Sequence, residues 1–235
     1  MVCGKGGCGK SSLVTLTARA LEARGYGVLA LDGDASNPGG LAHLLLGLEQ
    51  GPDPLIDFFG GRDRVTCPVD DPSPLTRAGE TTALAETGIK LDEINPAYVR
   101  REENIVLLQV GKIREAYEGC DGPMSKVTRD LVVQGDAVTL IDVEAGIEHF
   151  GRGVEKNVDA VLVVIDPTFE SLCIAGRVGD LCRRMGIGNV WTVLNKVTSA
   201  DMEDQMMKAL GHRHIPILGV VHHDPEVVQA GLAGR

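Results

Sequence analysis

The sequence has no surplus of basic residues, no long apolar run and no secretory start. Its 23 lysines and arginines are outnumbered by 33 aspartates and glutamates, which gives a formal net charge of −10 and a pI near 5.1. A broad nucleic-acid-binding surface needs clustered positive charge, so no nucleic-acid partner is expected. No run approaches the roughly 18 apolar residues of a membrane span, and the chain begins with a glycine-rich loop. We therefore expect a cytoplasmic protein without a membrane partner.

The cysteines are too scattered for a disulfide framework. We expect free thiols, metal ligands or small core residues at the six positions, which are Cys3, Cys8, Cys67, Cys120, Cys173 and Cys182. Packing is the favoured role for Cys8, Cys67, Cys173 and Cys182.

Short apolar runs alternate with helical patterns along the chain. Runs that read as strands buried on both faces, as in parallel sheets, occur at residues 27–32, 105–111, 137–142, 160–166, 190–195 and 217–221. Helical patterns occupy residues 11–24, 41–46, 124–133, 170–185 and 201–210. This rhythm predicts an α/β fold in a single domain over residues 1–235, with a doubly wound, mostly parallel sheet flanked by helices.

Two segments fit this pattern less well. Residues 51–103 are rich in proline, glycine and charge, and we expect a long surface excursion there with one short helix. Only residues 1–3 precede the glycine-rich loop, so the first strand is expected to be trimmed or weakly paired.

Residues 4–11, Gly-Lys-Gly-Gly-Cys-Gly-Lys-Ser, match the phosphate-loop pattern G-x-x-x-x-G-K-[ST] of nucleoside triphosphatases. Its glycines let backbone N–H groups converge on phosphate oxygens, and the following helix presents its positive end. Lys10 is expected to reach the β- and γ-phosphates, and Ser11 a magnesium ion. The residues expected to bind ATP here are Gly4, Gly6, Gly7, Cys8, Gly9, Lys10, Ser11 and Ser12.

Acidic residues follow two of the expected strands, at the edge where open α/β sheets bind ligands. Asp32 and Asp34 follow the second strand, and Asp142 ends a later one in the form of a Walker B site that holds magnesium. Gly146 lies where its N–H could turn toward the γ-phosphate. Ser36 or Asn37 is expected to cap the helix that comes next.

The loop contains a lysine in addition to Lys10, and this residue, Lys5, narrows the choice among phosphate-loop families. The run K-G-G-x-G-K-S resembles the deviant phosphate loop of the nitrogenase iron protein, the septum-site ATPase MinD and the partition ATPase ParA. The resemblance implies that Lys5 crosses a nucleotide-sandwich homodimer to the partner's phosphates, and that Asp34 orients the attacking water. It also implies adenine contacts for Asn195, Lys196 and the loop ending at Asp224. The alternative for Lys5 is a solvated loop lysine.

The stretch from Asp142 to Leu172, with its AGIEH run followed by RG and VD, is similar to the CooC-type ATPases that assist nickel insertion into carbon monoxide dehydrogenase. The resemblance implies a Mg-ATPase that dimerises with ATP and acts in metallocentre maturation for a nickel or iron–sulfur client enzyme. His149 in this stretch either reports the nucleotide state or is a hydrogen-bonded interface histidine.

That family carries a Cys-x-Cys pair that binds metal between two protomers, and this sequence keeps only Cys120, with Gly122 in the second position. Cys120 is therefore a nickel or zinc ligand or reactive thiolate, a partner in an iron–sulfur cluster, or a buried inert thiol. Gly122→Cys is expected to complete a four-sulfur site and tighten metal binding.

Two other classes remain open. One is a positioning switch of the MinD or ParA type, although residues 226–235 are neither long nor basic enough for a membrane-targeting helix. The other is an ATP-gated iron–sulfur reductase of the nitrogenase iron protein type, which would need a second cysteine after Asp142.

Overall fold

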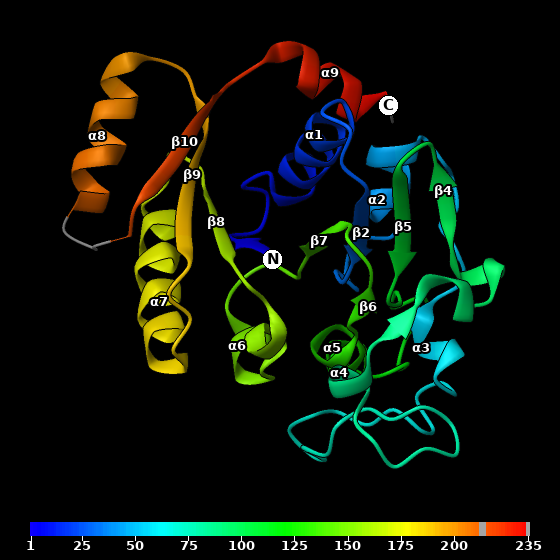
Figure 1. The fold of residues 1–235 in the computed structure, drawn as a ribbon. Coiled ribbons are helices and arrows are strands. Elements are labelled where there is room, and N and C mark those ends of the chain that lie inside the picture. Colours follow the sequence, from blue (N-terminus) through cyan, green and yellow to red (C-terminus); the bar gives the residue numbers. More distant parts are fainter. Residues whose placement is uncertain (212–214, 234–235) are drawn as a thin grey trace.

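The computed structural model describes residues 1–211 and 215–233, and it contains an eight-stranded sheet in the order β10-β9-β8-β1-β7-β2-β5-β4 (Figure 1). Each neighbouring pair is parallel except β4 and β5, which are antiparallel. The strands are β1 (Val2–Gly4), β2 (Val28–Asp32), β4 (Arg100–Glu102), β5 (Ile105–Gln109), β7 (Val138–Asp142), β8 (Val161–Ile165), β9 (Val190–Val197) and β10 (Ile217–His222). The six predicted strands and the predicted fold class are confirmed.

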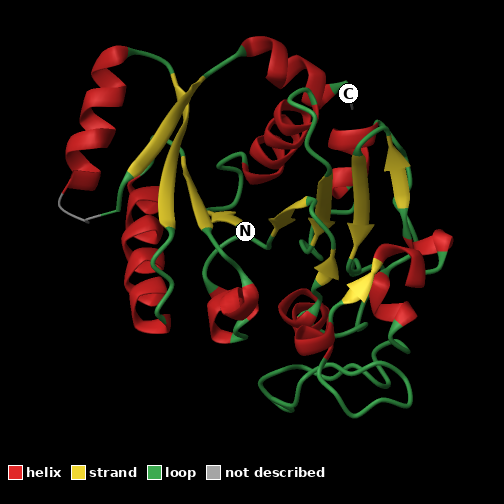
Figure 2. Ribbon diagram, viewed as in Figure 1, coloured by secondary structure: helices red, strands yellow, loops and turns green. Residues whose placement is uncertain are grey.

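Helices flank this sheet, as Figure 2 shows. They are α1 (Lys10–Glu22), α2 (Gly40–Leu46), α3 (Leu55–Phe58), α4 (Leu84–Thr87), α5 (Gly122–Asp130), α6 (Glu148–Gly151), α7 (Phe169–Met185), α8 (Ala200–Gly211) and α9 (Pro225–Leu232), with 3₁₀ turns η1 (Leu91–Glu93), η2 (Pro96–Tyr98) and η3 (Val154–Asn157). In the described part of the chain, no helix has both the length and the apolar character to cross a bilayer.

Alternation along β8 shows why the apolar runs form a sheet covered on both faces. Val163 and Ile165 pack in the core cluster that contains buried α7 residues, whereas Val164 packs in the cluster that contains Val14 and Ala18 of α1. Successive side chains of a strand point to opposite faces, so both faces are apolar.

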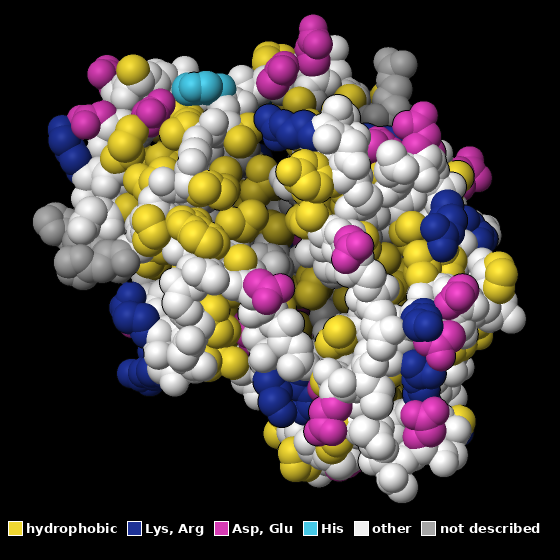
Figure 3. Space-filling view, in the orientation of Figure 1, with side chains coloured by type: hydrophobic (Ala, Val, Ile, Leu, Met, Phe, Trp, Pro, Cys, Tyr) yellow, Lys and Arg dark blue, Asp and Glu magenta, His cyan; other side chains and the backbone are white. Residues whose placement is uncertain are grey.

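The first strand is short, as expected, but it is paired on both sides at the centre of the sheet. Three of its residues pair with β8, and Val2 pairs with Asp142 of β7. Beside it, β7 is less buried than its apolar sequence predicts, because a hollow lined by apolar side chains of β1, β2 and β7 opens on one face (Figure 3).

Residues 51–103 lie largely at the surface, as their composition predicts, but several of their side chains also belong to the core. Leu55, Leu75, Leu84 and Ile89 are buried in one core cluster together with residues of α5. The segment contains α3, α4, two 3₁₀ turns and β4, and its two-residue strand β3 (Ile89–Lys90) pairs with β6 (Val133–Gln134). The predicted helix over 124–133 therefore ends earlier, because Val133 belongs to that second small sheet.

The cysteines divide by burial. Cys8 and Cys182 are buried, as expected for packing residues, and Cys3 is buried too. Cys173 is exposed on α7, so the packing role predicted for it is wrong, whereas Cys67 is half-buried and its predicted packing role is not contradicted. All six are free thiols.

Candidate functional site

The phosphate loop joins β1 to α1, and its path depends on two glycines with positive φ. Gly4 has a φ of 145° and Gly9 a φ of 102°. A Cβ atom at Gly4 would lie 2.5 Å from the carbonyl oxygen of Val164, and one at Gly9 would lie 2.2 Å from Nδ2 of Asn195. Only glycine combines this backbone conformation with such close approach.

Lys10, the first residue of α1, lies within this loop. It is 6% exposed, and its Nζ donates to the carbonyl oxygen of Lys5 at 3.5 Å. Gly9 is the N-cap of α1 and has no side chain that could accept a hydrogen bond from the first turn. The helix N-terminus therefore keeps N–H groups and its positive end for an anion beside Lys10.

Asp142 ends β7 next to this helix. It is 1% exposed and receives a hydrogen bond from the Ser11 side chain, while its Oδ1 has no partner among the described residues. Burial raises the pKa of Asp142 to about 7, and the nearby carboxylates of Asp32 and Asp34 add to the rise. A buried carboxylate oxygen without a partner, beside a hydroxyl group, fits a magnesium ion that takes its other ligands from phosphate and water.

A buried ion pair supports the neighbouring strand end. Lys112 Nζ donates to both carboxylate oxygens of Asp32 at 2.9 Å and to the carbonyl oxygen of Asp34 at 2.6 Å. The Lys112 and Asp32 side chains are 4% and 1% exposed. Burial raises the pKa of Asp32, and the Lys112 ammonium opposes that rise. Sequence reasoning missed Lys112, although a lysine three residues beyond the end of β5 was a signal for it.

Asp34 faces this region from the loop after β2. Its Oδ1 accepts from the N–H and hydroxyl groups of Ser36 at 2.9 Å and 2.6 Å. Asn37 Oδ1 accepts from the N–H of Gly40, the first residue of α2, at 3.2 Å. The N-cap of α2 is nevertheless Gly39, without a side-chain cap, so the expectation that Ser36 or Asn37 occupies that position is wrong, and Ser36 is instead bound to Asp34.

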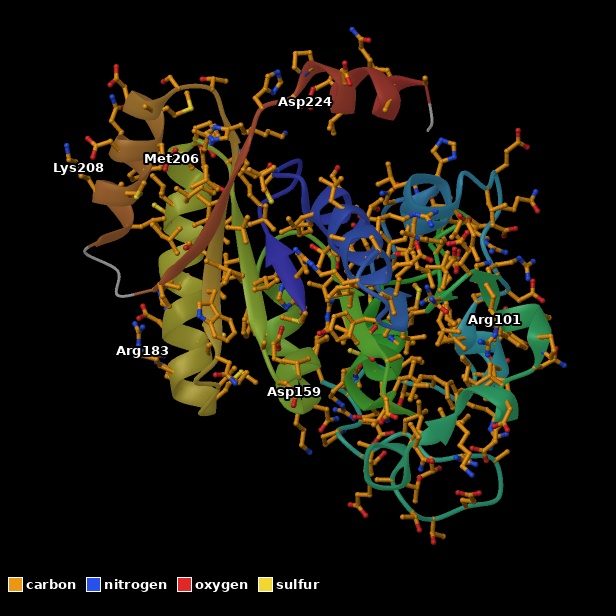
Figure 4. All side chains as sticks on the ribbon, turned by 45° about the horizontal axis from the view of Figure 1, so that its top comes forward. Arg101, Asp159, Arg183, Met206, Lys208 and Asp224 are labelled. Carbon is orange, nitrogen blue, oxygen red and sulfur yellow. The ribbon has the colours of Figure 1, made fainter. Side chains whose placement is uncertain are left out.

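An apolar pocket lies on the other side of the loop, where α9 approaches α1. It is lined by Gly9, Ser12, Leu13, Leu16, Asn195, Lys196, Val221, His222, His223, Asp224, Val227 and Val228. Asn195 Nδ2 donates to the carbonyl oxygen of Cys8 at 2.8 Å, and Lys196 Nζ donates to that of Gly7 at 2.6 Å. Asp224, at the junction of β10 and α9 (Figure 4), also caps α9. The three residues expected at the base thus line one pocket next to the phosphate loop.

Two residues of the expected site are bound within the protein. The N–H of Gly146 donates to the carbonyl oxygen of Gly4 at 3.1 Å, and its contact with the γ-phosphate stays a prediction. Lys5 Nζ donates to Thr168 Oγ1 at 3.0 Å and lies 3.4 Å from Asp166 Oδ2. Lys5 is therefore bound within its own chain rather than being a solvated lysine.

The loop before α5 connects Cys120 with the segment after Asp142. Asp121 is the N-cap of α5, and its carboxylate accepts from Arg152 and shares a hydrogen bond with Glu144. Burial, and next that hydrogen bond, raise the pKa of Glu144 to about 7. Cys120 itself is exposed, which excludes a buried inert thiol.

His149 lies in α6, the short helix that follows the Asp142 segment. It is buried, its Nδ1 is hydrogen-bonded to the Glu155 carboxylate, and its Nε2 has no partner in the described ranges. The hydrogen bond of His149 lies within the protomer, so its two expected roles, as a reporter of the nucleotide state or as an interface histidine, both stay predictions.

The comparisons with known proteins agree with one another on a single family. The model of the CobQ/CobB/MinD/ParA nucleotide binding domain matches residues 1–235. An uncharacterized ATP-binding protein of Methanocaldococcus jannaschii is 35% identical over 238 residues, which cover 100% of this chain and 91% of that protein. The carbon monoxide dehydrogenase accessory protein CooC of Rhodospirillum rubrum is 35% identical over 209 residues, which cover 84% of this chain and 74% of that protein. The septum site-determining protein MinD of Pyrococcus horikoshii, solved with Mg-ADP, shares the fold with a TM-score of 0.65 at 20% identity, covering 99% of this chain and 84% of that one.

Proposed function

This chain belongs to the CobQ/CobB/MinD/ParA family and is a P-loop ATPase, and from that premise we propose that it works as an ATP-closed homodimer in the maturation of a metal-containing enzyme. The client is a nickel or iron–sulfur enzyme of the carbon monoxide dehydrogenase kind. The cargo is a nickel or zinc ion, and the site for it includes Cys120.

Phosphoryl transfer depends on charges that are already in position. Lys10 offsets negative charge on the transferred group, and Asp34 orients the attacking water. Ser11 and Asp142 would hold a magnesium ion, which when bound would neutralise charge on the phosphates. The unpartnered Asp142 oxygen supports this assignment.

Lys5 acts in trans in the closed dimer. Here it is held by Asp166 and Thr168, so closure exchanges the Asp166 carboxylate for the partner's triphosphate. Phe169, next to Thr168, is 75% exposed, and Tyr117, close in sequence to Cys120, is also fully exposed. An exposed aromatic side chain at each position supports protein contacts there.

One observation carries the metal-handling part of the proposal: the Cys120 loop is bonded to the segment that follows the magnesium ligand. Asp121 contacts Glu144 and Arg152, and Glu144 is two residues from Asp142. A shift of the Asp142 segment between nucleotide states would move Asp121 and with it the adjacent thiol. Such a connection lets ATP control metal retention.

The test is the affinity for zinc and for nickel, measured against a competing chelator in the presence of ADP or a non-hydrolysable ATP analogue. We expect the two nucleotides to give different metal affinities in the wild type, and Arg152→Ala to reduce that difference. Sedimentation of the same samples should show dimers only with the ATP analogue. Metal binding that is absent, or equal in both nucleotide states, would leave an ATPase without the maturation role.

A further inference from the structure

A second cysteine lies beside Cys120, from a segment far away in the sequence. A Cβ atom placed on Gly122 would lie 2.6 Å from Sγ and 2.8 Å from Cβ of Cys67, and 3.3 Å from Sγ of Cys120. Both sulfurs therefore lie within 3.3 Å of one point, and the missing side chain of Gly122 leaves the space that Cys67 enters. Cys67 is half-buried and Cys120 exposed, so an ion from solvent can reach the pair.

The segment after Cys67 is held against α5 by charged side chains. Lys126 Nζ donates to Asp71 Oδ2 at 3.0 Å and to the Asp71 carbonyl oxygen at 3.1 Å. Arg129 Nη2 donates to the carbonyl oxygen of Ser73 at 3.1 Å, and Asp130 Oδ2 accepts from the N–H of Leu75 at 2.7 Å.

Cys67 is part of the same turn, since its carbonyl oxygen accepts from the N–H groups of Asp70 and Asp71 at 3.1 Å and 2.9 Å. Cys120 immediately precedes the N-cap of α5, and Arg62 Nη1 donates to its carbonyl oxygen at 2.6 Å. Both thiols thus belong to segments attached to the head of α5, and both sulfurs lie near Gly122.

We propose that Cys67 and Cys120 of one protomer form a dithiolate site for a thiophilic divalent cation of the zinc, nickel and cobalt class. Binding converts two thiols into two thiolates, so two protons are released for each ion bound, and no electron is transferred. Thiolate ligands favour such soft or borderline ions over magnesium or calcium. The inference rests on the proposed metal-handling function and supplies the sulfur ligand that position 122 does not.

The site changes what position 122 is expected to do. A cysteine or alanine at 122 would place its Cβ where the Cys67 sulfur lies, so either should displace Cys67. Gly122→Cys is therefore not expected simply to add a sulfur beside Cys120, because it also displaces Cys67. Gly122→Ala displaces Cys67 without adding a sulfur, so it should weaken metal binding. Four-coordinate sites of this kind use four protein ligands, and two protomers that each bring two sulfurs supply four.

The experiment is an anaerobic titration of the nucleotide-free protein with Co²⁺ alone, followed by competition with Zn²⁺, in a phosphine reductant. Thiolate-to-cobalt charge transfer in the near ultraviolet reports sulfur ligation. We expect Cys67→Ser and Cys120→Ser each to remove most of this band and to weaken binding by more than about 100-fold, beyond what loss of an outer hydrogen-bond partner causes. Gly122→Ala should weaken it too, whereas Cys173→Ser, which removes an exposed thiol on α7, should not.

A bifunctional thiol reagent gives a second readout that needs no metal. Dibromobimane should bridge the two thiols in the wild type and in Cys173→Ser, and in neither Cys67→Ser nor Cys120→Ser. If Cys67→Ser binds cobalt like the wild type while Cys120→Ser does not, the dithiolate site is wrong and Cys120 alone serves the proposed function. If both variants bind like the wild type, the metal-binding role of this loop is wrong as well. ATP-dependent dimerisation, measured by sedimentation, then tests the ATPase cycle independently of metal binding.

Discussion

The phosphate loop and the head of α5 are held in place by different kinds of contact. In the loop, the shape comes from the backbone: Gly4 and Gly9 adopt positive φ angles, and carbonyl oxygens accept hydrogen bonds from Asn195 and Lys196. At the head of α5, charged side chains hold a distant segment, with Lys126 bound to Asp71 as the clearest example.

This difference predicts how each region responds to substitution. A loop whose path follows from its glycines tolerates most other side-chain changes within it, because only the Asn195 and Lys196 side chains, among the described residues, donate to its carbonyl oxygens from outside. A region joined by charged side chains is weakened whenever one partner is removed, since the other is left without its hydrogen bonds. The following substitutions test this comparison.

The largest effect is expected at Lys10, where the loop presents its charge. Lys10→Ala should lower the turnover number for ATP by about 10²–10³-fold, the usual loss when one positioned charge-stabilising group is removed, and leave the fold intact. Steady-state hydrolysis checks the rate, and far-ultraviolet circular dichroism checks the fold. Lys208→Ala, on the outer helix α8, is the charge-matched control. Near wild-type turnover in Lys10→Ala would contradict the phosphate-loop assignment.

The second substitution, at Lys112, tests whether a single charged side chain also holds the strand end next to the phosphate loop. Lys112→Met leaves the buried Asp32 without its cation and should lower the free energy of unfolding by about 3 kcal/mol. Urea denaturation measures the change. The control is Arg183→Ala, which breaks the exposed pair with Asp180 and should cost about 0–1 kcal/mol. Equal effects in the two variants would show that the Asp32 pair does not hold this edge.

Substitutions at Lys5 and at its partner Asp166 distinguish a role of Lys5 within the protomer from a role across the dimer. Lys5→Gln should weaken ATP-dependent dimerisation by at least about 2 kcal/mol, or roughly 30-fold, because the partner's phosphates lose a cation. Asp166→Asn, which loosens the resting hold on Lys5, should instead favour the dimer slightly. Sedimentation with an ATP analogue distinguishes the two. A Lys5→Gln protein that dimerises normally would return Lys5 to a role within its own chain.

The smallest effect is expected from the contact that positions the Cys67 segment. Lys126→Met removes the cation bound to Asp71 and should lower the yield of bimane bridging between Cys67 and Cys120 a few-fold. Arg129 and Asp130 still hold the following residues, so the pairing should not disappear. Mass spectrometry of the labelled peptides measures the yield. An unchanged yield would show that Lys126 is not what brings the segment to α5.

Local pattern was sufficient for the strands, the phosphate loop and the acids at the strand ends, because each of these is encoded by neighbouring residues. Lys112 was missed because its partner Asp32 lies 80 residues earlier. Cys67 was assigned to packing because its neighbour Cys120 comes from another part of the chain.

The buried residues within 51–103 are hidden from sequence analysis for a related reason. Leu75, Leu84 and Ile89 are buried one at a time among prolines, glycines and charges, so no periodic run marks them as core. Their burial depends on α5, and no local pattern contains that information.

Because of the position of β1, a bound nucleotide would connect the two halves of the sheet and stabilise their contact. β1 pairs three residues with β8 but joins β7 at Val2 and Asp142, so the two halves of the sheet meet along a weak line. The hollow beside β7 leaves that line with little packing on one face. A ligand that contacts Asp142 on one side and Asn195 on the other spans both halves, so hydrogen exchange at β1 and β7 should slow more on nucleotide binding than exchange at β5.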